Sequence, residues 1–143
     1  MAVKAKQLRY AVELEPGDVL RSEDGTPLEP AESWSPEHLL LAALARCTLK
    51  SLRFHARRAN IRVTLTAGSA SSLVTRREDD GLYAVVEADV ALAVELEPAP
   101  GGLELGELLA KAQRDCFVGA SLRAKPTYRW TVNGTAVGPA PQP

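Results

Sequence analysis

The feature that most constrains the fold is one long apolar helix, predicted between Ser35 and Asn60. Ser35 is a favourable N-cap, Pro36 suits the first helical position, and Glu37 places negative charge at the positive end of the helix dipole. At the other end, Asn60 suits the left-handed conformation that often terminates a helix. The sequence therefore predicts a helix with both ends marked.

The first part of this helix is apolar on every side. Each residue from Leu39 to Ala45 is a leucine or an alanine, and a helix without a polar face lies in the centre of a structure rather than on its surface. The helix becomes amphipathic further on, where Lys50, Arg53, Arg57 and Arg58 appear. Because one short sheet does not cover this much apolar surface, we expect a homodimer that buries Leu39–Ala45.

The rest of the chain has the patterns of strands and of one further helix. Strands are predicted at Leu8–Leu14, Val19–Arg21, Ile61–Val74, Leu82–Leu96 and about Thr127–Val132, and a helix at Leu105–Ala112, with Cys116 one turn further on. Helices do not alternate regularly with strands, which predicts an α+β fold. We expect residues 1–133 to form a single domain, and residues 134–143, rich in glycine, proline and alanine, to form a flexible tail.

Length and charge narrow the classes of function. A chain of 143 residues fits one domain, and a net charge of −1 shows no basic excess for nucleic acid. The N-terminal segment has no apolar signal-like run, and no segment reaches the length that spans a membrane. We therefore expect a cytoplasmic protein with no nucleic-acid and no membrane partner.

Cys47 and Cys116 are the two thiols of the chain. In a cytosolic protein they are more often free or redox-active than joined in a structural disulfide. A cysteine on an apolar helix is most often a small buried hydrophobic residue, and this interpretation stays open. The functional interpretation requires both cysteines to converge, one as a nucleophile and the other as the thiol that resolves it by forming a disulfide.

The histidines do not extend this chemistry. His55 follows Cys47 by eight residues, about 12 Å along a helix axis, which is too far for a hydrogen bond within one chain. The two histidines and two cysteines match no zinc-binding spacing, and the chain contains no nucleotide-binding or serine-hydrolase motif. We expect neither a metal nor a cofactor.

Two stretches, SPEHLLLAALARC and DCFVGASLRAKPTYRWTV, together resemble the OsmC/Ohr family of peroxide-reducing proteins. That family has a helix that starts with Asn or Ser-Pro-Glu-x-Leu, a cysteine ten residues after the glutamate, and a second cysteine ahead of the last strand. In this chain the pattern falls on Ser35–Glu37, Leu39, Cys47 and Cys116. The ordered set covers nearly the whole chain, from the first hairpin to the last strand.

The resemblance implies an OsmC-like fold, in which antiparallel sheets pack on a long central helix within an intertwined homodimer. It also implies a cysteine-based, thiol-dependent reductase of organic hydroperoxides that acts in stress defence. In such an enzyme Cys47 attacks the peroxide and becomes a sulfenic acid, and Cys116 condenses with it. An external dithiol, of the lipoyl type in the best-known members of the family, then reduces the disulfide.

The resemblance also assigns Glu37 a part in ordering the site. Glu37 and Cys47 are about 15 Å apart along one helix, so a glutamate at this position approaches a thiol only from the other subunit. This geometry favours a site at a dimer interface. The alternative, that Glu37 is a helix-start charge and nothing more, stays open.

The chain departs from the peroxidase pattern in its first hairpin and around its second cysteine. Peroxidase members carry an arginine seven residues before the Ser-x-x-Gly turn, and this chain has Glu15 there, with Arg9 and Arg21 as possible substitutes. The usual Cys-Pro-x-Ser around the second cysteine is replaced by the sequence from Cys116 to Gly119. One alternative is therefore an OsmC-like dimer without peroxidase activity that binds a small apolar or electrophilic ligand or senses redox state. Another is a structural dimer with two inert thiols.

Overall fold

The computed structural model describes residues 4–138, and it confirms the α+β fold. In chain order the elements are β1 (Val12–Glu15), β2 (Val19–Ser22), β3 (Pro27–Leu28), α1 (Pro36–Arg58), β4 (Arg62–Arg76), β5 (Tyr83–Glu97), α2 (Gly102–Arg114), α3 (Phe117–Ser121), β6 (Thr127–Val132) and β7 (Thr135–Ala136). The chain divides into two compact units, Met1–Pro36 and Glu37–Pro143. Among the described residues, no helix combines the length and the hydrophobicity that crossing a membrane requires.

The N-terminal unit contains a small antiparallel sheet in the order β1-β2-β3. β1 pairs with β2 from Val12 opposite Ser22 to Glu15 opposite Val19, and the turn between them uses positive φ angles at Gly17 and Asp18. The structure differs from the sequence prediction at both ends of this sheet. The first strand begins at Val12 rather than at Leu8, and a two-residue strand that was not predicted forms at Pro27–Leu28.

The long helix α1 has the predicted ends. It begins at Pro36 and ends at Arg58, and Asn60 takes the left-handed conformation with φ of 59°. The N–H of Ile61 closes the end of the helix by donating to the carbonyl of Ala56 at 2.8 Å. The predicted burial of its apolar part is incomplete in one chain. Within the run Leu39–Ala45, only Leu44 is buried.

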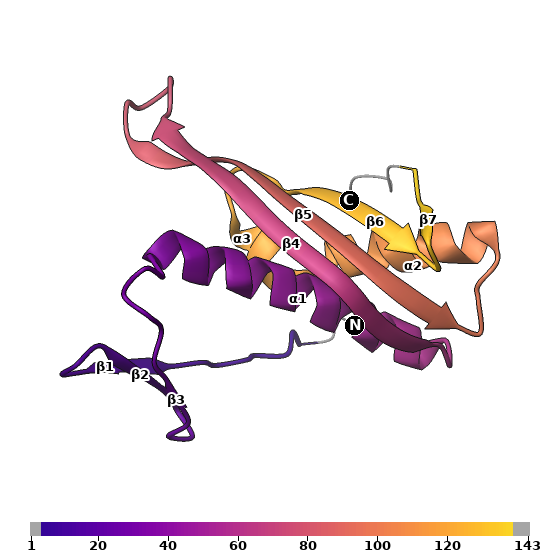
Figure 1. The fold of residues 1–143 in the computed structure, drawn as a ribbon, viewed down its shortest axis with the longest axis horizontal. Helices are drawn as coiled ribbons and strands as arrows, with labels where there is room; N and C mark the ends of the chain where they lie inside the picture. The colour runs from indigo at the N-terminus through magenta and orange to yellow at the C-terminus, as the bar shows by residue number, and fades with distance from the viewer. Residues whose placement is uncertain (1–3, 139–143) are drawn as a thin grey trace. The chain divides into compact units, whose positions relative to one another are not determined.

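The larger sheet has the strand order β4-β5-β6-β7 and mixes both strand directions (Figure 1). β4 and β5 form a long antiparallel hairpin, and β6 and β7 are also antiparallel. β6, however, runs parallel to β5. The expectation of antiparallel sheets therefore does not hold for this pair, because the connection through α2 and α3 returns the chain to the same end of the sheet before β6 begins.

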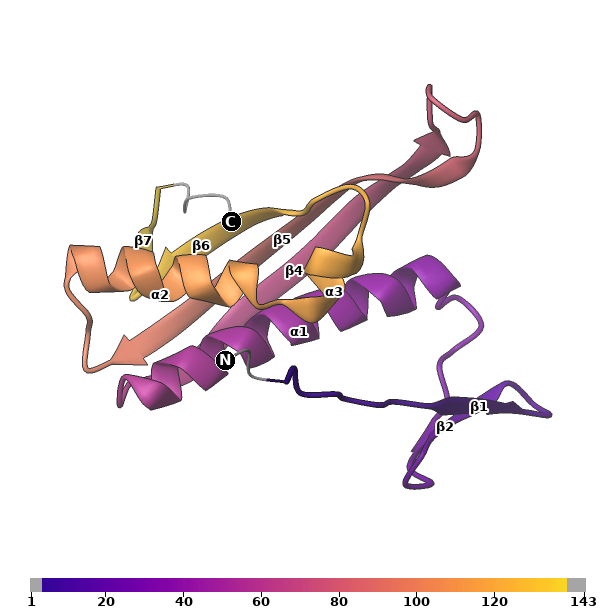
Figure 2. The same cartoon turned by 180° about the vertical axis from the view of Figure 1, so that it is seen from behind.

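The hydrophobic core lies between one face of this sheet and the helices α1 and α2, which both lie in front of the strands in Figure 2. Alternate side chains of β5 point into it, which is the period-two pattern of a strand with one buried face. The buried apolar residues of the core are Leu44, Leu52, Ala56, Ile61, Ala88, Val90, Leu92, Val94, Leu96, Leu108, Leu109, Ala112, Cys116, Trp130 and Val132.

The segment predicted as a tail contains one ordered element. Thr135–Ala136 forms β7 and pairs with Thr131 and Val132 of β6, so the chain remains part of the sheet beyond residue 133. Asn133 and Gly134 make the turn between the two strands with positive φ angles. Residues 139–143 of the predicted tail lie outside the described residues, and the single domain over residues 1–133 stays a prediction.

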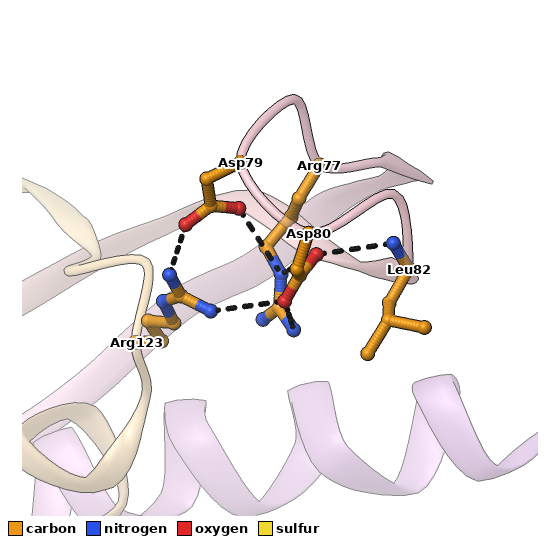
Figure 3. Close-up of polar contacts among 5 residues, drawn as sticks. All are labelled: Arg77, Asp79, Asp80, Leu82 and Arg123. Carbon is orange, nitrogen blue, oxygen red and sulfur yellow. Dashed lines mark hydrogen bonds and ion pairs between the residues drawn. The ribbon is translucent and has the colours of Figure 1, made fainter.

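The tip of the β4–β5 hairpin is tied by ion pairs to the segment that follows α3 (Figure 3). Arg77 donates to both carboxylate oxygens of Asp80, at 3.1 and 2.6 Å. Arg123 reaches the same tip and pairs with Asp79 and with Asp80, the latter at 3.3 Å. This group of four charged residues, the hairpin-tip cluster, therefore links two segments that are far apart in the sequence.

Candidate functional site

Cys47 lies near the middle of α1, half-buried, and packs against the edge of the core. The helix turns its Thr48 and Leu44 inward, where both are fully buried. Of the two cysteines, Cys47 is therefore the one whose thiol remains partly accessible to solvent in a single chain.

Cys116 lies between α2 and α3 and is fully buried. It is the N-cap residue of α3, and its sulfur accepts a hydrogen bond from the backbone N–H of Gly119 at 3.4 Å. The Oγ1 of Thr48 on α1 lies 3.4 Å from the same sulfur. These contacts fix the position of the Cys116 thiol against α1.

The structure brings the two thiols together. Burial raises the pKa of the Cys47 thiol, and Cys116 raises it further through charge repulsion and a hydrogen bond. The backbone N–H groups of Val118 and Phe117, at the start of α3, act in the opposite direction and lower that pKa. The convergence that the functional interpretation required is therefore present within one chain, and α3 supplies the backbone donors beside it.

Two further side chains of the thiol site were missed by the sequence analysis: Thr48 and Tyr128. Thr48 follows Cys47 on α1, and Tyr128 comes from β6, where burial first and the two cysteines next raise the pKa of its hydroxyl group. One sequence signal was available, since Tyr128, Trp130 and Val132 alternate along a strand and so share a face with the apolar core. Nothing in the sequence showed that this face meets Cys116.

Glu37 does not belong to this group within one chain. It lies in the exposed first turn of α1, ten residues before Cys47 on the same helix. Glu37 and Cys47 are therefore separated along one helix, as the sequence analysis expected.

The residues considered in place of the family arginine lie in the N-terminal unit and have partners there. Glu15 forms an ion pair with Arg21, and Arg21 also donates to the carbonyl of Gly25 at 3.1 Å. Arg9 donates to the side chain of Gln7 at 3.3 Å. The negative charge of Glu15 is therefore offset by Arg21 inside its own unit.

His55 has a partner other than Cys47, as its spacing required. Its Nε2 lies 2.7 Å from a carboxylate oxygen of Asp115, the residue before Cys116. Hydrogen bonds from Arg114 and then from His55 lower the pKa of Asp115 to about 2. In the part of the chain that the structure describes, no three His, Cys, Asp or Glu side chains gather as a metal site would need.

Two surface hollows lie near these elements, and neither is lined by a cysteine. A hollow of about 170 Å³ between α1 and α2 is lined by His55, Arg58, Lys111 and their neighbours. A wider one of about 680 Å³ lies along β4, β5, β6 and β7, with Ala67, Ala91 and Thr131 among its lining residues.

Comparison with known proteins identifies the fold. The family model described as OsmC-like protein matches residues 29–131. No curated protein sequence matches the chain.

Solved structures match nearly the whole chain at low sequence identity. An OsmC-like protein of unknown function from Vibrio cholerae has a TM-score of 0.62 at 13% identity, with 87% of this chain and 99% of that one covered. An organic hydroperoxide resistance protein from Elizabethkingia anophelis has a TM-score of 0.57 at 19% identity, with coverage of 90% and 98%. An OsmC-like protein from Mycoplasma pneumoniae has a TM-score of 0.57 at 15% identity, with coverage of 91% and 98%. These likenesses confirm the OsmC-like fold.

Proposed function

Because this chain belongs to the OsmC-like protein family, we propose that it is a cysteine-based, thiol-dependent reductase of organic hydroperoxides. Cys47 is the peroxidatic residue and Cys116 the resolving one. The observation that carries the proposal is the meeting of two free thiols from different elements, one half-buried on α1 and one fully buried ahead of α3. A core that served packing alone would not require two neighbouring thiols with backbone N–H donors beside them.

The proposed reaction uses both sulfurs in turn. The Cys47 thiolate attacks one peroxide oxygen, the O–O bond breaks, and the organic part leaves as an alcohol after taking up a proton. The Cys47 sulfenic acid then condenses with the Cys116 thiol, which forms the S–S bond and releases water. An external dithiol of the lipoyl type returns both cysteines to thiols by exchange.

A homodimer is part of the proposal. The thiolate is the nucleophile, yet within one chain burial raises the pKa of Cys47, and no basic side chain among the described residues lowers it. A second copy that packs on the half-covered Leu39–Ala45 segment places the partner's Glu37 within reach of the site, where it helps to order the groups around Cys47. The exposed Ala42 and Ala43 support such packing.

The test counts thiols before and after one equivalent of cumene hydroperoxide and identifies the product by mass spectrometry. We expect both thiols to disappear within seconds and a Cys47–Cys116 disulfide to form. Cys47→Ser abolishes the reaction, whereas Cys116→Ser accumulates a sulfenic acid that dimedone traps. If both thiols of the wild-type protein persist after long exposure, the proposal is wrong.

The raised pKa of Cys47 favours a second candidate function. A thiol that stays protonated at neutral pH reacts slowly with peroxides, and an OsmC-like dimer then binds a small apolar or electrophilic ligand or senses redox state instead. Thermal stabilisation by such a ligand that is unchanged in Cys47→Ser, together with persistent thiols in the wild-type protein, supports this candidate over the reductase.

A further inference from the structure

The space beside Gly119 is occupied by the hydroxyl group of Tyr128. Gly119 is buried in α3, and a Cβ atom at this position would overlap the Tyr128 Oη. The same Cβ would lie 3.3 Å from the Cys116 Sγ. The phenol oxygen and the thiol therefore lie on the same side of Gly119, and the missing side chain is what lets the phenol reach this place.

Tyr128 reaches this place because of its position on β6. It pairs in register with Val90 of β5 and points to the same face of the sheet as Trp130 and Val132, both of which are buried. This face packs against the helices, so the long phenol side chain extends from the sheet toward Cys116. Tyr128 is itself half-buried.

Two side chains beside the Cys116 sulfur can donate to it, the Cys47 thiol and the Tyr128 hydroxyl, whereas Thr48 cannot. Thr48 lies 3.4 Å from the sulfur, but its hydroxyl proton is already donated to the carbonyl of Leu44 at 2.8 Å. Thr48 can therefore accept from the neutral thiol but cannot donate to a thiolate. Apart from Cys47, the groups beside the sulfur that can donate to it are the Gly119 N–H and the Tyr128 hydroxyl, which also interacts with Thr48.

The hydroxyl of Tyr128 keeps its proton while the thiols react. Burial raises its pKa above the ordinary value, and Cys116 and Cys47 raise it further. The titratable groups that face the Cys116 sulfur are Cys47 from α1 and Tyr128 from β6, while Asp115, just before it, pairs with Arg114 and His55. Tyr128 thus remains protonated, and so a hydrogen-bond donor, at neutral pH.

We propose that Tyr128 is a third functional side chain of the thiol site, whose hydroxyl group hydrogen-bonds the Cys116 sulfur and holds it ready for disulfide formation. The proposal rests on the proposed function and specifies its second step. In that step the Cys116 sulfur attacks the oxidised Cys47 sulfur, the S–S bond forms and the S–O bond breaks. The leaving oxygen, with its own hydrogen and the proton lost by Cys116, becomes water.

The test uses 5,5′-dithiobis(2-nitrobenzoate), so that it does not depend on peroxidase activity. Cys47 first exchanges with the reagent and releases one thionitrobenzoate; Cys116 then attacks the mixed disulfide and releases a second. Because a hydrogen bond to a charged group is lost, we expect Tyr128→Phe to slow the second release about tenfold or more. The first release should stay within about twofold of the wild-type rate. The control is Tyr83→Phe, an exposed tyrosine of β5, which should leave both rates unchanged.

A rescue variant separates a hydrogen-bonding role from a packing role. Tyr128→Phe combined with Gly119→Ser removes the phenol oxygen and places a new hydroxyl beside Cys116. We expect the second release in this double variant to be at least threefold faster than in Tyr128→Phe alone. A second release at the wild-type rate in Tyr128→Phe overturns the inference, and so does equal slowing of both releases. If the thiols of the wild-type protein do not react with cumene hydroperoxide, the proposed reductase function is overturned but the role of Tyr128 is not.

Discussion

A methyl group added at Gly119 has no room in the folded protein. Its Cβ would overlap the Tyr128 Oη and press on the Cys116 sulfur at 3.3 Å, and forcing extra atoms into a packed interior typically costs about 1–3 kcal/mol. We expect Gly119→Ala to lower the free energy of unfolding by that amount in urea titrations. The matched control is Gly106→Ala in α2, where no atom lies within 4 Å of the new Cβ. That change should be neutral or stabilising by about 0.5–1 kcal/mol, since alanine is the better helix former. Equal destabilisation by both variants would contradict the close packing of Tyr128.

The ionisation of Cys47 depends on its neighbour. Within one chain, burial and then Cys116 raise its pKa, so alkylation of Cys47 by iodoacetamide should be slower than that of free cysteine and should accelerate as pH rises. Cys116→Ala removes the contribution of the second thiol but not that of burial. We therefore expect alkylation of Cys47 at pH 7.5 to become faster in this variant while staying below the free-thiol rate, as measured by peptide mass spectrometry. An unchanged rate would show that Cys116 does not act on Cys47.

Single residues show what the sequence could and could not predict. Pro36 and Asn60 mark the ends of α1 because their backbone preferences are local, and the structure confirms both. Thr48 and Tyr128 were missed because their role depends on which elements meet. The alternation of Tyr128 with Trp130 placed it on the buried face of a strand, but only the packing of β6 against α3 brings its hydroxyl to Cys116.

The contact between His55 and Asp115 joins the second half of α1 to the end of α2. Hydrogen bonds from Arg114 and then His55 lower the pKa of Asp115 to about 2, from 3.8. A carboxyl group with a lowered pKa in the folded state stabilises it above about pH 4, and this contribution is lost as the pH falls toward 2. We expect Asp115→Asn to lower the midpoint of thermal unfolding at pH 7 and to approach the wild-type midpoint near pH 2. The control is Asp89→Asn, since the carboxylate of Asp89 lies 3.7 Å from Arg129. If the difference in unfolding midpoint between Asp115→Asn and the wild-type protein does not change with pH, this linkage is wrong.

The hairpin-tip cluster connects the β4–β5 hairpin to the segment between α3 and β6. Its charges are largely exposed, and exposed ion pairs add little to global stability, so we expect the effect of losing Arg123 to be local. Arg123→Gln should speed hydrogen–deuterium exchange at the backbone amides of α3, including those of Phe117 and Val118 that face Cys47. Arg62→Gln, which removes another exposed ion pair, with Glu97, should leave α3 unchanged. Unaltered exchange in α3 on loss of Arg123 would show that the cluster does not hold this helix.

The elements that the sequence failed to predict are short or depend on distant partners. α3 has five residues, too few for a helical period to be recognised. β3 and β7 have two residues each and exist only through pairing with β2 and β6. The direction of β6 relative to β5 follows from the crossover through α2 and α3. The strand itself was predicted at about Thr127–Val132, which agrees with its observed ends.

The whole molecule has an apolar segment that one chain does not fully cover. The run Leu39–Ala45 predicted a central helix, yet Leu44 alone is buried there, and Ala42 and Ala43 are exposed. The second half of α1 shows the opposite, with Leu52 and Ala56 fully buried against the core of the same chain. The helix is therefore central along its C-terminal half within one chain, and its N-terminal half becomes central only if a second copy packs on it.

A charge placed on this segment should separate the proposed dimer. We expect the wild-type chain of 15.3 kDa to show twice that mass by light scattering, and Ala43→Glu to shift it toward the monomer, because burying an unpaired carboxylate is unfavourable. Leu103→Glu, which places the same charge on an exposed position of α2, should remain dimeric. If the partner's Glu37 and helix complete the site, the monomeric variant should also lose its reaction with cumene hydroperoxide while keeping its fold by circular dichroism. A wild-type monomer, or a monomeric variant that reacts at the full rate, would place all the chemistry within one chain and leave the exposed half of α1 without a role in it.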